Sequence, residues 1–179
     1  MNTLIAKSIF GCPATIEAPK PDEAALVELA QSLEKRSRQL LGRSLTIREV
    51  DAGSCNGCEL EVHAVNNPVY DLERFGIKFV ASPKHADVLL VTGPVTHNMK
   101  VALERVYAVT PDPKWIVAMG DCACTGGVFA GSYACVGPTS AVIPVDLHIK
   151  GCPPKPIDLL RGLLALLEAA SGSVKAAKA

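Results

Sequence analysis

Five short apolar runs alternate with stretches of helical periodicity along this 179-residue chain. This alternation constrains the possible folds more than any other feature of the sequence. The runs are LTIREV (45–50), IKFVAS (77–82), DVLLVTG (87–93), KWIVAMG (114–120) and AVIPVDLHI (141–149). Pro144 cannot donate to a sheet ladder, so the fifth strand is expected to begin near Val145. Helices are predicted at 23–41 (with Asp22 as its cap), 57–65, 97–108 and 156–170. We therefore predict an α/β fold, a flavodoxin-like, mostly parallel sheet with helices on both faces.

The ends of the chain differ in composition from its middle. Residues 1–21 include the Pro-rich stretch GCPATIEAPKP and are expected to form an extended lead-in. Residues 22–170 carry the alternating pattern and are predicted to form one α/β domain. The tail 171–179, SGSVKAAKA, is small and polar, and we expect it to be disordered. The Gly-rich stretch between the fourth and fifth runs, which begins GDCACTGG, is expected to be a functional loop.

Four cysteines follow directly after three of the apolar runs. Cys55 and Cys58 follow the first run, Cys122 follows the fourth, and Cys152 follows the fifth. Because ligands of open α/β sheets bind outside the carboxyl ends of the strands, we expect these thiols to meet at one edge. Cys124, two residues after Cys122, is the only competing ligand.

Four converging thiolates suit either a structural zinc ion or an iron–sulfur cluster. The chain has seven cysteines and no recognisable export signal, which favours metal or redox chemistry over disulfides. The last two ligands are single and distant from each other, unlike the paired knuckles of zinc ribbons. Gly126 and Gly127 allow backbone to approach a bulky group, and Pro153 stiffens the last ligand loop. These features favour a cluster over zinc, and over a thioredoxin-type dithiol.

Composition excludes some classes of partner. The chain has 18 basic and 18 acidic residues and a formal net charge of zero, which argues against a nucleic-acid-binding surface. No uninterrupted apolar run approaches the ~18 residues that a membrane-spanning helix needs. The chain is therefore expected to be soluble or peripheral to a membrane.

The motifs SCNGCELE, GDCACTGG and GCPP together resemble those of the small, electron-transfer subunits of nickel–iron hydrogenases. The homologous 20-kilodalton subunit of respiratory NADH–quinone oxidoreductase shares the pattern. The resemblance covers about residues 45–167 and is greatest for the energy-converting, membrane-bound enzymes of the formate hydrogenlyase and hydrogenase-4 type. It implies that Cys55, Cys58, Cys122 and Cys152 hold a single 4Fe–4S cluster next to the nickel–iron site of a large subunit.

The resemblance also implies partners and a place in the cell. Electrons would pass between the nickel–iron site and ferredoxin-like subunits, within a complex that contains integral membrane subunits. The spaced C-x-x-C is typical of hydrogenases, whereas the corresponding chain of the quinone oxidoreductase has adjacent cysteines. The absence of a twin-arginine leader, and of any cysteine after Cys152, favours one cluster on the cytoplasmic side of the membrane.

Two other functions are compatible with the same residues. One is the equivalent subunit of a quinone- or sulfur-reducing complex, and the other is a zinc-stabilised interaction module. Glu59 and Glu61 are candidates for a proton relay or for subunit docking, with a solvated helix face as the alternative. Of the two, we expect Glu61 to matter more. His97 is a candidate for tuning the cluster or contacting a partner, and Cys12, Cys124 and Cys135 are expected not to be ligands.

Overall fold

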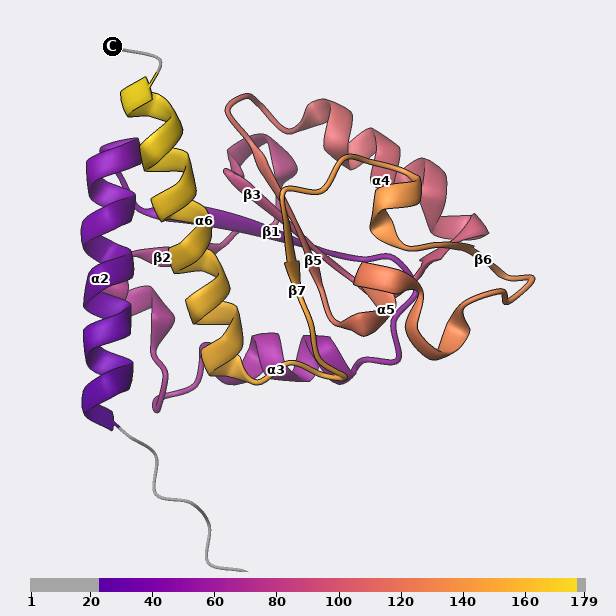
Figure 1. Cartoon of the computed structure of the whole chain (residues 1–179), viewed down its shortest axis with the longest axis horizontal. Coiled ribbons are helices and arrows are strands. Elements are labelled where there is room, and N and C mark those ends of the chain that lie inside the picture. Colours follow the sequence, from indigo (N-terminus) through magenta and orange to yellow (C-terminus); the bar gives the residue numbers. More distant parts are fainter. Residues whose placement is uncertain (1–22, 177–179) are drawn as a thin grey trace, which may run out of the picture.

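A computed structural model describes residues 23–176 of the chain, and a parallel sheet lies at its centre (Figure 1). The helices and strands, in chain order, are α2 (Glu23–Leu41), β1 (Leu45–Asp51), α3 (Gly57–Val65), β2 (Ile77–Phe79), β3 (Val88–Thr92), β4 (Val95–Thr96), α4 (His97–Val109), β5 (Trp115–Met119), α5 (Asp121–Thr125), β6 (Cys135–Gly137), β7 (Leu147–Ile149) and α6 (Pro156–Ala176). Short 3₁₀ turns lie at Leu72–Phe75, Pro83–His85, Gly127–Phe129 and Thr139–Ala141. Between Glu23 and Ala176, no helix is long and apolar enough to cross a membrane.

The sheet has the strand order β2-β1-β3-β5-β7, and every neighbouring pair in it is parallel. Counting only these five strands, the order is the flavodoxin-like 2-1-3-4-5. The order reverses between β1 and β3, so the switch point where such sheets bind ligands lies at the carboxyl ends of those two strands. The predicted fold class is confirmed.

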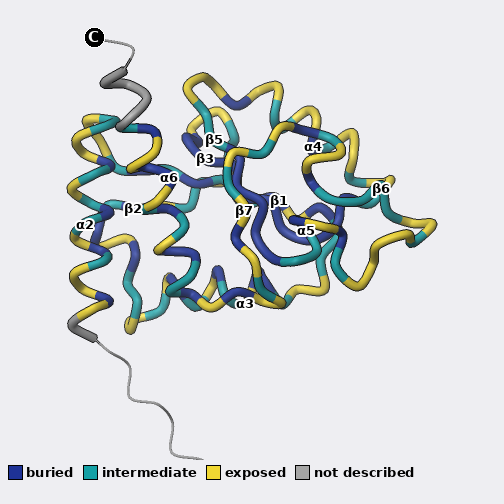
Figure 2. The backbone as a smooth tube through the Cα atoms, viewed as in Figure 1, coloured by how far each residue is buried: buried dark blue, intermediate teal, exposed yellow. Residues whose placement is uncertain are grey.

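Helices cover both faces of the sheet, and each face has its own apolar core. On one face, α2, α3 and α6 pack against the sheet in a cluster that includes Leu33, Ile47 and Leu163. On the other face, α4 contributes Leu103 to a smaller cluster with Leu89 and Ile116. These side chains are almost completely buried, and the strands appear as the buried centre of Figure 2. Burying each such side chain contributes about 1.5–3 kcal/mol to folding, and this anchors the strands whose ends carry the site.

Several predicted boundaries agree with the structure and others do not. The helices predicted at 23–41 and 57–65 have the observed bounds, although the proposed cap Asp22 lies outside the described residues, as does the lead-in 1–21. The predicted end of the last helix at 170 is wrong, because α6 continues to Ala176. The helix continues through Gly172, although a glycine in a helix interior costs about 1 kcal/mol relative to alanine. The predicted disordered tail therefore begins too early, and its residues 177–179 lie outside the described part.

Two strand predictions were too long. β2 ends at Phe79 instead of residue 82, because the chain turns into the 3₁₀ turn that begins at Pro83. β7 begins at Leu147 instead of Val145. Just before β7, the carboxylate of Asp146 accepts a hydrogen bond from the backbone N–H of Ile116 at 2.7 Å, so a side chain replaces one ladder contact.

Asp87 links the amino ends of β1 and β3, at the edge of the sheet opposite the cysteines. Its buried carboxylate accepts hydrogen bonds from the Arg43 guanidinium at 2.6 and 3.0 Å and from the Thr46 backbone and hydroxyl at 3.0 and 2.7 Å. We expect Asp87→Ala to leave the Thr46 backbone N–H without its acceptor, to break the ion pair with Arg43, and to lower the free energy of local opening by about 2–4 kcal/mol.

Hydrogen exchange on the assembled protein would measure this effect as faster exchange of the β1 and β3 amides. The matched control is Glu168→Ala, which removes a surface ion pair to Arg36 at 3.9 Å and should change stability by less than about 1 kcal/mol. Equal exchange rates in the two variants would contradict the assigned role of Asp87.

Candidate functional site

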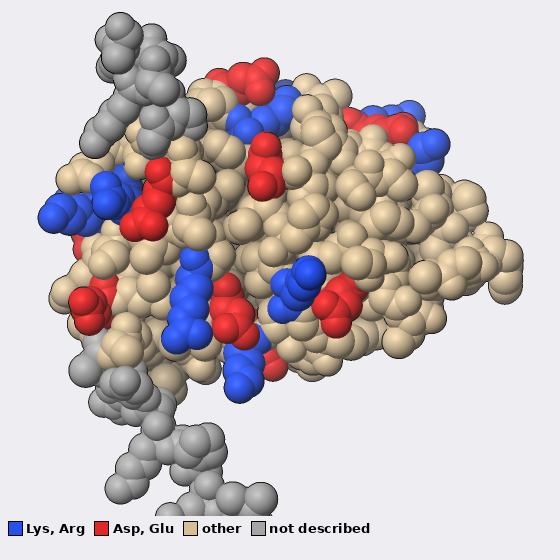
Figure 3. All heavy atoms as spheres, viewed as in Figure 1, with Lys and Arg blue, Asp and Glu red and all other residues tan. Residues whose placement is uncertain are grey.

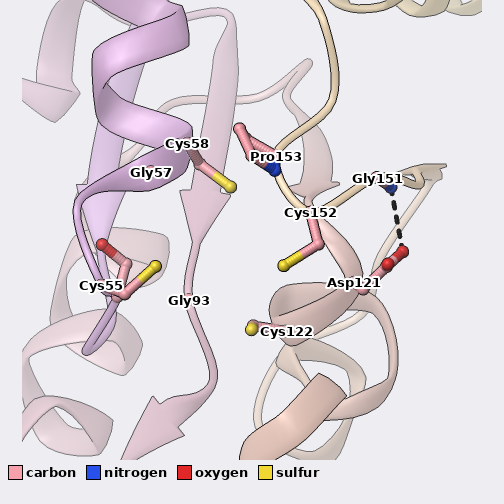
Figure 4. Close-up of a pocket in the computed structure, with 10 residues that line it drawn as sticks. Cys55, Gly57, Cys58, Gly93, Asp121, Cys122, Gly151, Cys152 and Pro153 are labelled. Atoms are coloured by element: carbon pink, nitrogen blue, oxygen red, sulfur yellow. Dashed lines mark hydrogen bonds between the residues drawn. The ribbon is translucent and has the colours of Figure 1, made fainter. Parts of the chain in front are cut away.

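The carboxyl edge of the sheet brings four cysteines from three strands to one pocket (Figure 4). Cys55 lies in the loop after β1, and Cys58 lies in the first turn of α3. Cys122 lies on α5 directly after β5, and Cys152 lies in the loop after β7. Figure 4 shows their sulfurs directed into the same space, those of Cys55 and Cys58 from one side and those of Cys122 and Cys152 from the other. The expected convergence at one edge is therefore observed.

The remaining residues of the pocket wall were not identified from the sequence, except for Pro153. They are Ser54, Gly57, Gly93, Asp121, Gly151 and Pro153. Gly93 follows β3, so the pocket lies at the switch point between β1 and β3. Each of these residues is adjacent in the sequence to a strand end or to a cysteine. That adjacency is the only sequence signal that could have predicted their place in the pocket wall.

The pocket is larger than one metal ion requires. Its volume is about 130 Å³, whereas a cavity for one water molecule needs only about 10–15 Å³. Within residues 23–176, no three His, Cys, Asp or Glu side chains are arranged to hold a single metal ion. Four thiols around a space of this size fit a group of several atoms, such as an iron–sulfur cluster.

Two glycines let the backbone pass close to the sulfurs. A Cβ atom at Gly120 would lie 2.6 Å from the Cys58 sulfur, and one at Gly127 would lie 2.9 Å from the Cys122 sulfur. Both residues also have positive φ angles, 90° and 51°, which side chains disfavour. Gly126 differs from the expectation, because a Cβ there would approach Ala130 at 3.3 Å instead of a sulfur.

Two of the pocket thiols, those of Cys58 and Cys122, have raised pKa values. Burial raises the pKa of Cys58 to about 12, with further increases from the nearby Glu59 carboxylate and from the other three cysteines. Burial also raises the pKa of Cys122, and the nearby thiolate charges of Cys152 and Cys55 raise it further. These mutual effects show that the four sulfurs lie near one another. A positively charged iron core would offset their repulsion, and its binding would release protons.

Cys124 faces away from the pocket. Its thiol is buried and donates to the backbone carbonyls of Ala118 at 3.5 Å and Ile149 at 3.7 Å, and burial raises its pKa. It is not part of the pocket wall, so the geometry favours Cys122 as the ligand. Cys135 lies in β6, away from the wall, and Cys12 lies outside the described residues.

The loop that carries Cys55 is held by the last residue of β1. The Asp51 carboxylate oxygen Oδ1 accepts hydrogen bonds from the backbone N–H groups of Gly53 and Ser54, both at 2.7 Å. The Ser54 hydroxyl then accepts one from the N–H of Asn56 at 3.0 Å. Local side chain–backbone hydrogen bonds of this kind define a turn without a regular ladder. They place Cys55 at the rim of the pocket.

The other candidate residues differ in their surroundings. Glu59 is 8% exposed, and neither of its carboxylate oxygens has a hydrogen-bond partner among the described residues. A solvated helix face therefore does not describe Glu59. Glu61 is half-buried on α3. His97 is exposed at the start of α4 and does not line the pocket.

The fold and the pocket define a class: a flavodoxin-like α/β protein with a four-cysteine site at its topological switch point. Comparison with known families is more specific. The chain belongs to the family described as the 20-kDa subunit of NADH ubiquinone oxidoreductase, which matches residues 55–166. The match includes all four cysteines of the pocket.

Individual relatives come from several kinds of respiratory complex. The chain is 47% identical to the probable membrane-bound hydrogenase subunit mbhJ of Pyrococcus furiosus, over 80% of this chain and 87% of the relative. It is 42% identical to formate hydrogenlyase subunit 7 of Escherichia coli, over 86% of this chain and 60% of that protein. It is 49% identical to one of the NADH-quinone oxidoreductase subunits of Heliobacterium modesticaldum, over 61% of this chain and 63% of the relative.

A solved structure shares the fold. A chain of the membrane-bound sulfane sulfur reductase, an archaeal respiratory membrane complex, superposes with a TM-score of 0.65 at 34% sequence identity. The match covers 79% of this chain and 76% of the other.

Proposed function

We propose that this chain is the electron-transfer subunit of a multisubunit hydrogenase complex. Cys55, Cys58, Cys122 and Cys152 would hold one 4Fe–4S cluster next to the nickel–iron site of a large subunit. The single observation that carries the proposal is the convergence of these four thiols on one pocket at the switch point. The glycine cradle and the pocket volume support a cluster as its occupant.

The residues of the chain contribute binding, orientation and shielding. When bound, the cluster supplies one-electron transfer. The four thiolates would bind its iron, and the backbone at Gly120 and Gly127 lies close to the sulfurs of Cys58 and Cys122. The walls are mainly cysteine, glycine and proline, so few polar side chains would face the group. The polarity and hydrogen bonding of such walls tune the reduction potential of a bound cluster.

The names of two relatives support the proposed partners. We assign the chain to a complex with a nickel–iron large subunit, a ferredoxin-like iron–sulfur subunit and integral membrane subunits. Two relatives are subunits of a membrane-bound hydrogenase and of formate hydrogenlyase. We place the chain on the cytoplasmic side of the membrane as a peripheral subunit.

A second candidate keeps the cluster and changes the reaction. Similarity to a subunit of NADH-quinone oxidoreductase and to a sulfane sulfur reductase favours a quinone- or sulfur-reducing complex. The spaced cysteines at 55 and 58 favour the hydrogenase. Nickel in the purified complex, together with hydrogen production, would distinguish the two.

Iron and acid-labile sulfide analysis of the purified complex tests the proposal directly. We expect brown protein that contains iron and sulfide in equal amounts and gives an electron paramagnetic resonance signal after reduction. Colourless protein that contains zinc and no sulfide would establish the zinc-stabilised interaction module instead.

A proton-handling role for the glutamates gives a further prediction. Both lie on the helix that carries Cys58, and a carboxylate near a redox centre can move a proton during turnover. We expect Glu61→Gln to slow hydrogen production severalfold, and more than Glu59→Gln does, with the cluster intact in both. Rates measured at several pH values, with iron content as the control, would check this order. Wild-type rates of hydrogen production in both variants would contradict a role of these residues in proton handling or in subunit docking.

A further inference from the structure

Asp121 joins the two ligand loops at the end of β5 and β7. Its carboxylate oxygen Oδ1 accepts a hydrogen bond from the backbone N–H of Gly151 at 2.9 Å, which is drawn in Figure 4. Its own backbone N–H donates to the Gly151 carbonyl at 2.8 Å. Asp121 precedes Cys122 and Gly151 precedes Cys152, so this pair of hydrogen bonds connects the residues next to two candidate ligands.

The regular ladder between these strands has already ended at that point. Its last register pair is Met119 with Ile149, followed by one backbone bond from Gly120 N–H to the Ile149 carbonyl at 2.7 Å. Beyond it, the two segments diverge, one into α5, which carries Cys122, and the other into the loop that carries Cys152. The Asp121 side chain therefore extends the strand pairing by one step, into the wall of the pocket itself.

Asp121 also brings a negative charge to the pocket. The residue is one of those that line the space between the sulfurs, and it directly precedes Cys122 in the chain. A fixed negative charge disfavours the addition of an electron to a nearby redox group. The hydrogen bond to Gly151 keeps this carboxylate at a fixed position beside the two ligand segments, directed toward Gly151 and away from the sulfurs (Figure 4).

We propose that Asp121 is a positioning residue that holds the Cys152 loop against the Cys122 loop and lowers the reduction potential of the group bound between them. The inference rests on the proposed cluster. It assigns a role to a side chain that does not itself ligate iron, and it separates two contributions, one from the hydrogen bond and one from the charge.

Two substitutions separate these contributions in the assembled complex. Asp121→Asn keeps an oxygen that can accept from Gly151 and removes the charge, whereas Asp121→Ala removes both. The matched control is Glu104→Gln, which removes one charge from an exposed position on α4 outside the pocket wall. The readouts are a redox titration followed by electron paramagnetic resonance, and the rate at which a chelator removes iron.

We expect Asp121→Asn to retain its iron at the wild-type rate and to show a more positive midpoint potential. Asp121→Ala should lose iron roughly tenfold faster, because a charge-assisted hydrogen bond between the ligand loops is gone. Glu104→Gln should match wild type in both measurements. If Asp121→Ala does not assemble, the midpoint potential of Asp121→Asn still tests the electrostatic role of Asp121.

An unchanged potential in Asp121→Asn would overturn the electrostatic role, and unchanged iron loss in an assembled Asp121→Ala would overturn the positioning role. Either result with a normal wild-type cluster leaves the proposed function intact. Absence of iron and sulfide from the wild-type complex would instead remove the proposed function.

Discussion

Serine in place of Cys55, Cys58, Cys122 or Cys152 should abolish the iron–sulfur cluster or convert it to another form, whereas Cys124→Ser should keep it. Each of the four sulfurs points into the pocket from a different position, so no neighbouring thiol can replace a missing one without moving a loop. The expected loss is nearly complete, because a serine oxygen is a poor substitute for thiolate at iron.

Cys124 is the sharpest control for this experiment. It lies two residues from Cys122 on the same short helix, but its thiol bonds to backbone carbonyls on the other side. Iron and sulfide per chain, with electron paramagnetic resonance after reduction, would be measured on each purified complex. Cys135→Ser and Cys12→Ser should also keep the signal. A cluster that survives in Cys122→Ser and disappears in Cys124→Ser would mean that the wrong thiol of this pair has been assigned.

The parts of the fold that the sequence predicts well depend on local patterns. The apolar run 87–93 could only be a buried strand, and β3 is buried along its whole length. The helices predicted at 23–41 and 57–65 have strong apolar periodicity or a distinct start after a loop, and their bounds were correct. Because parallel strands end at a common edge, placement of the four cysteines followed from strand assignment alone.

The parts that the sequence does not predict depend on contacts between distant segments. The loop between β5 and β7 contains α5 and the strand β6, which pairs antiparallel with β4. No local pattern marks a three-residue strand such as CVG. The burial of Glu59 depends on how α3 packs against the sheet, and the bond from Gly151 to Asp121 spans thirty residues. Such features need the tertiary structure.

The surface beside the pocket indicates that this chain does not function alone. Residues 122–145 contain no Asp, Glu, Lys or Arg, and the end of the molecule around β6 shows no charged side chains in Figure 3. Four apolar side chains on α3 and on the segment that follows α5 are exposed, and we call them the rim patch: Leu60, Val128, Phe129 and Tyr133. Val128 is 84% exposed and Tyr133 is 96% exposed. Exposed apolar groups of this kind mark interaction sites.

Under the proposed function, the electron-transfer group must also lie close to its redox partner, and the rim patch lies on segments that carry or directly follow candidate ligands. We therefore expect the large subunit to cover this edge over ~2,000 Å² or more, as in permanent complexes of different chains. The chain expressed alone should aggregate or lose its iron, whereas the chain expressed with the large subunit should be soluble and brown.

Charged substitutions in the rim patch test where the partner binds. Val128→Asp and Tyr133→Asp should weaken co-purification with the large subunit, because a buried, unpaired carboxylate at an apolar interface is costly. Val109→Asp is the matched control, since Val109 is 47% exposed at the far end of α4, away from the pocket. Gel filtration with iron analysis would follow all three variants and the isolated wild-type chain. A stable wild-type monomer that keeps a full cluster would contradict the prediction of an obligate partner. An equal loss of co-purification in all three variants would show that the large subunit does not bind at the rim patch.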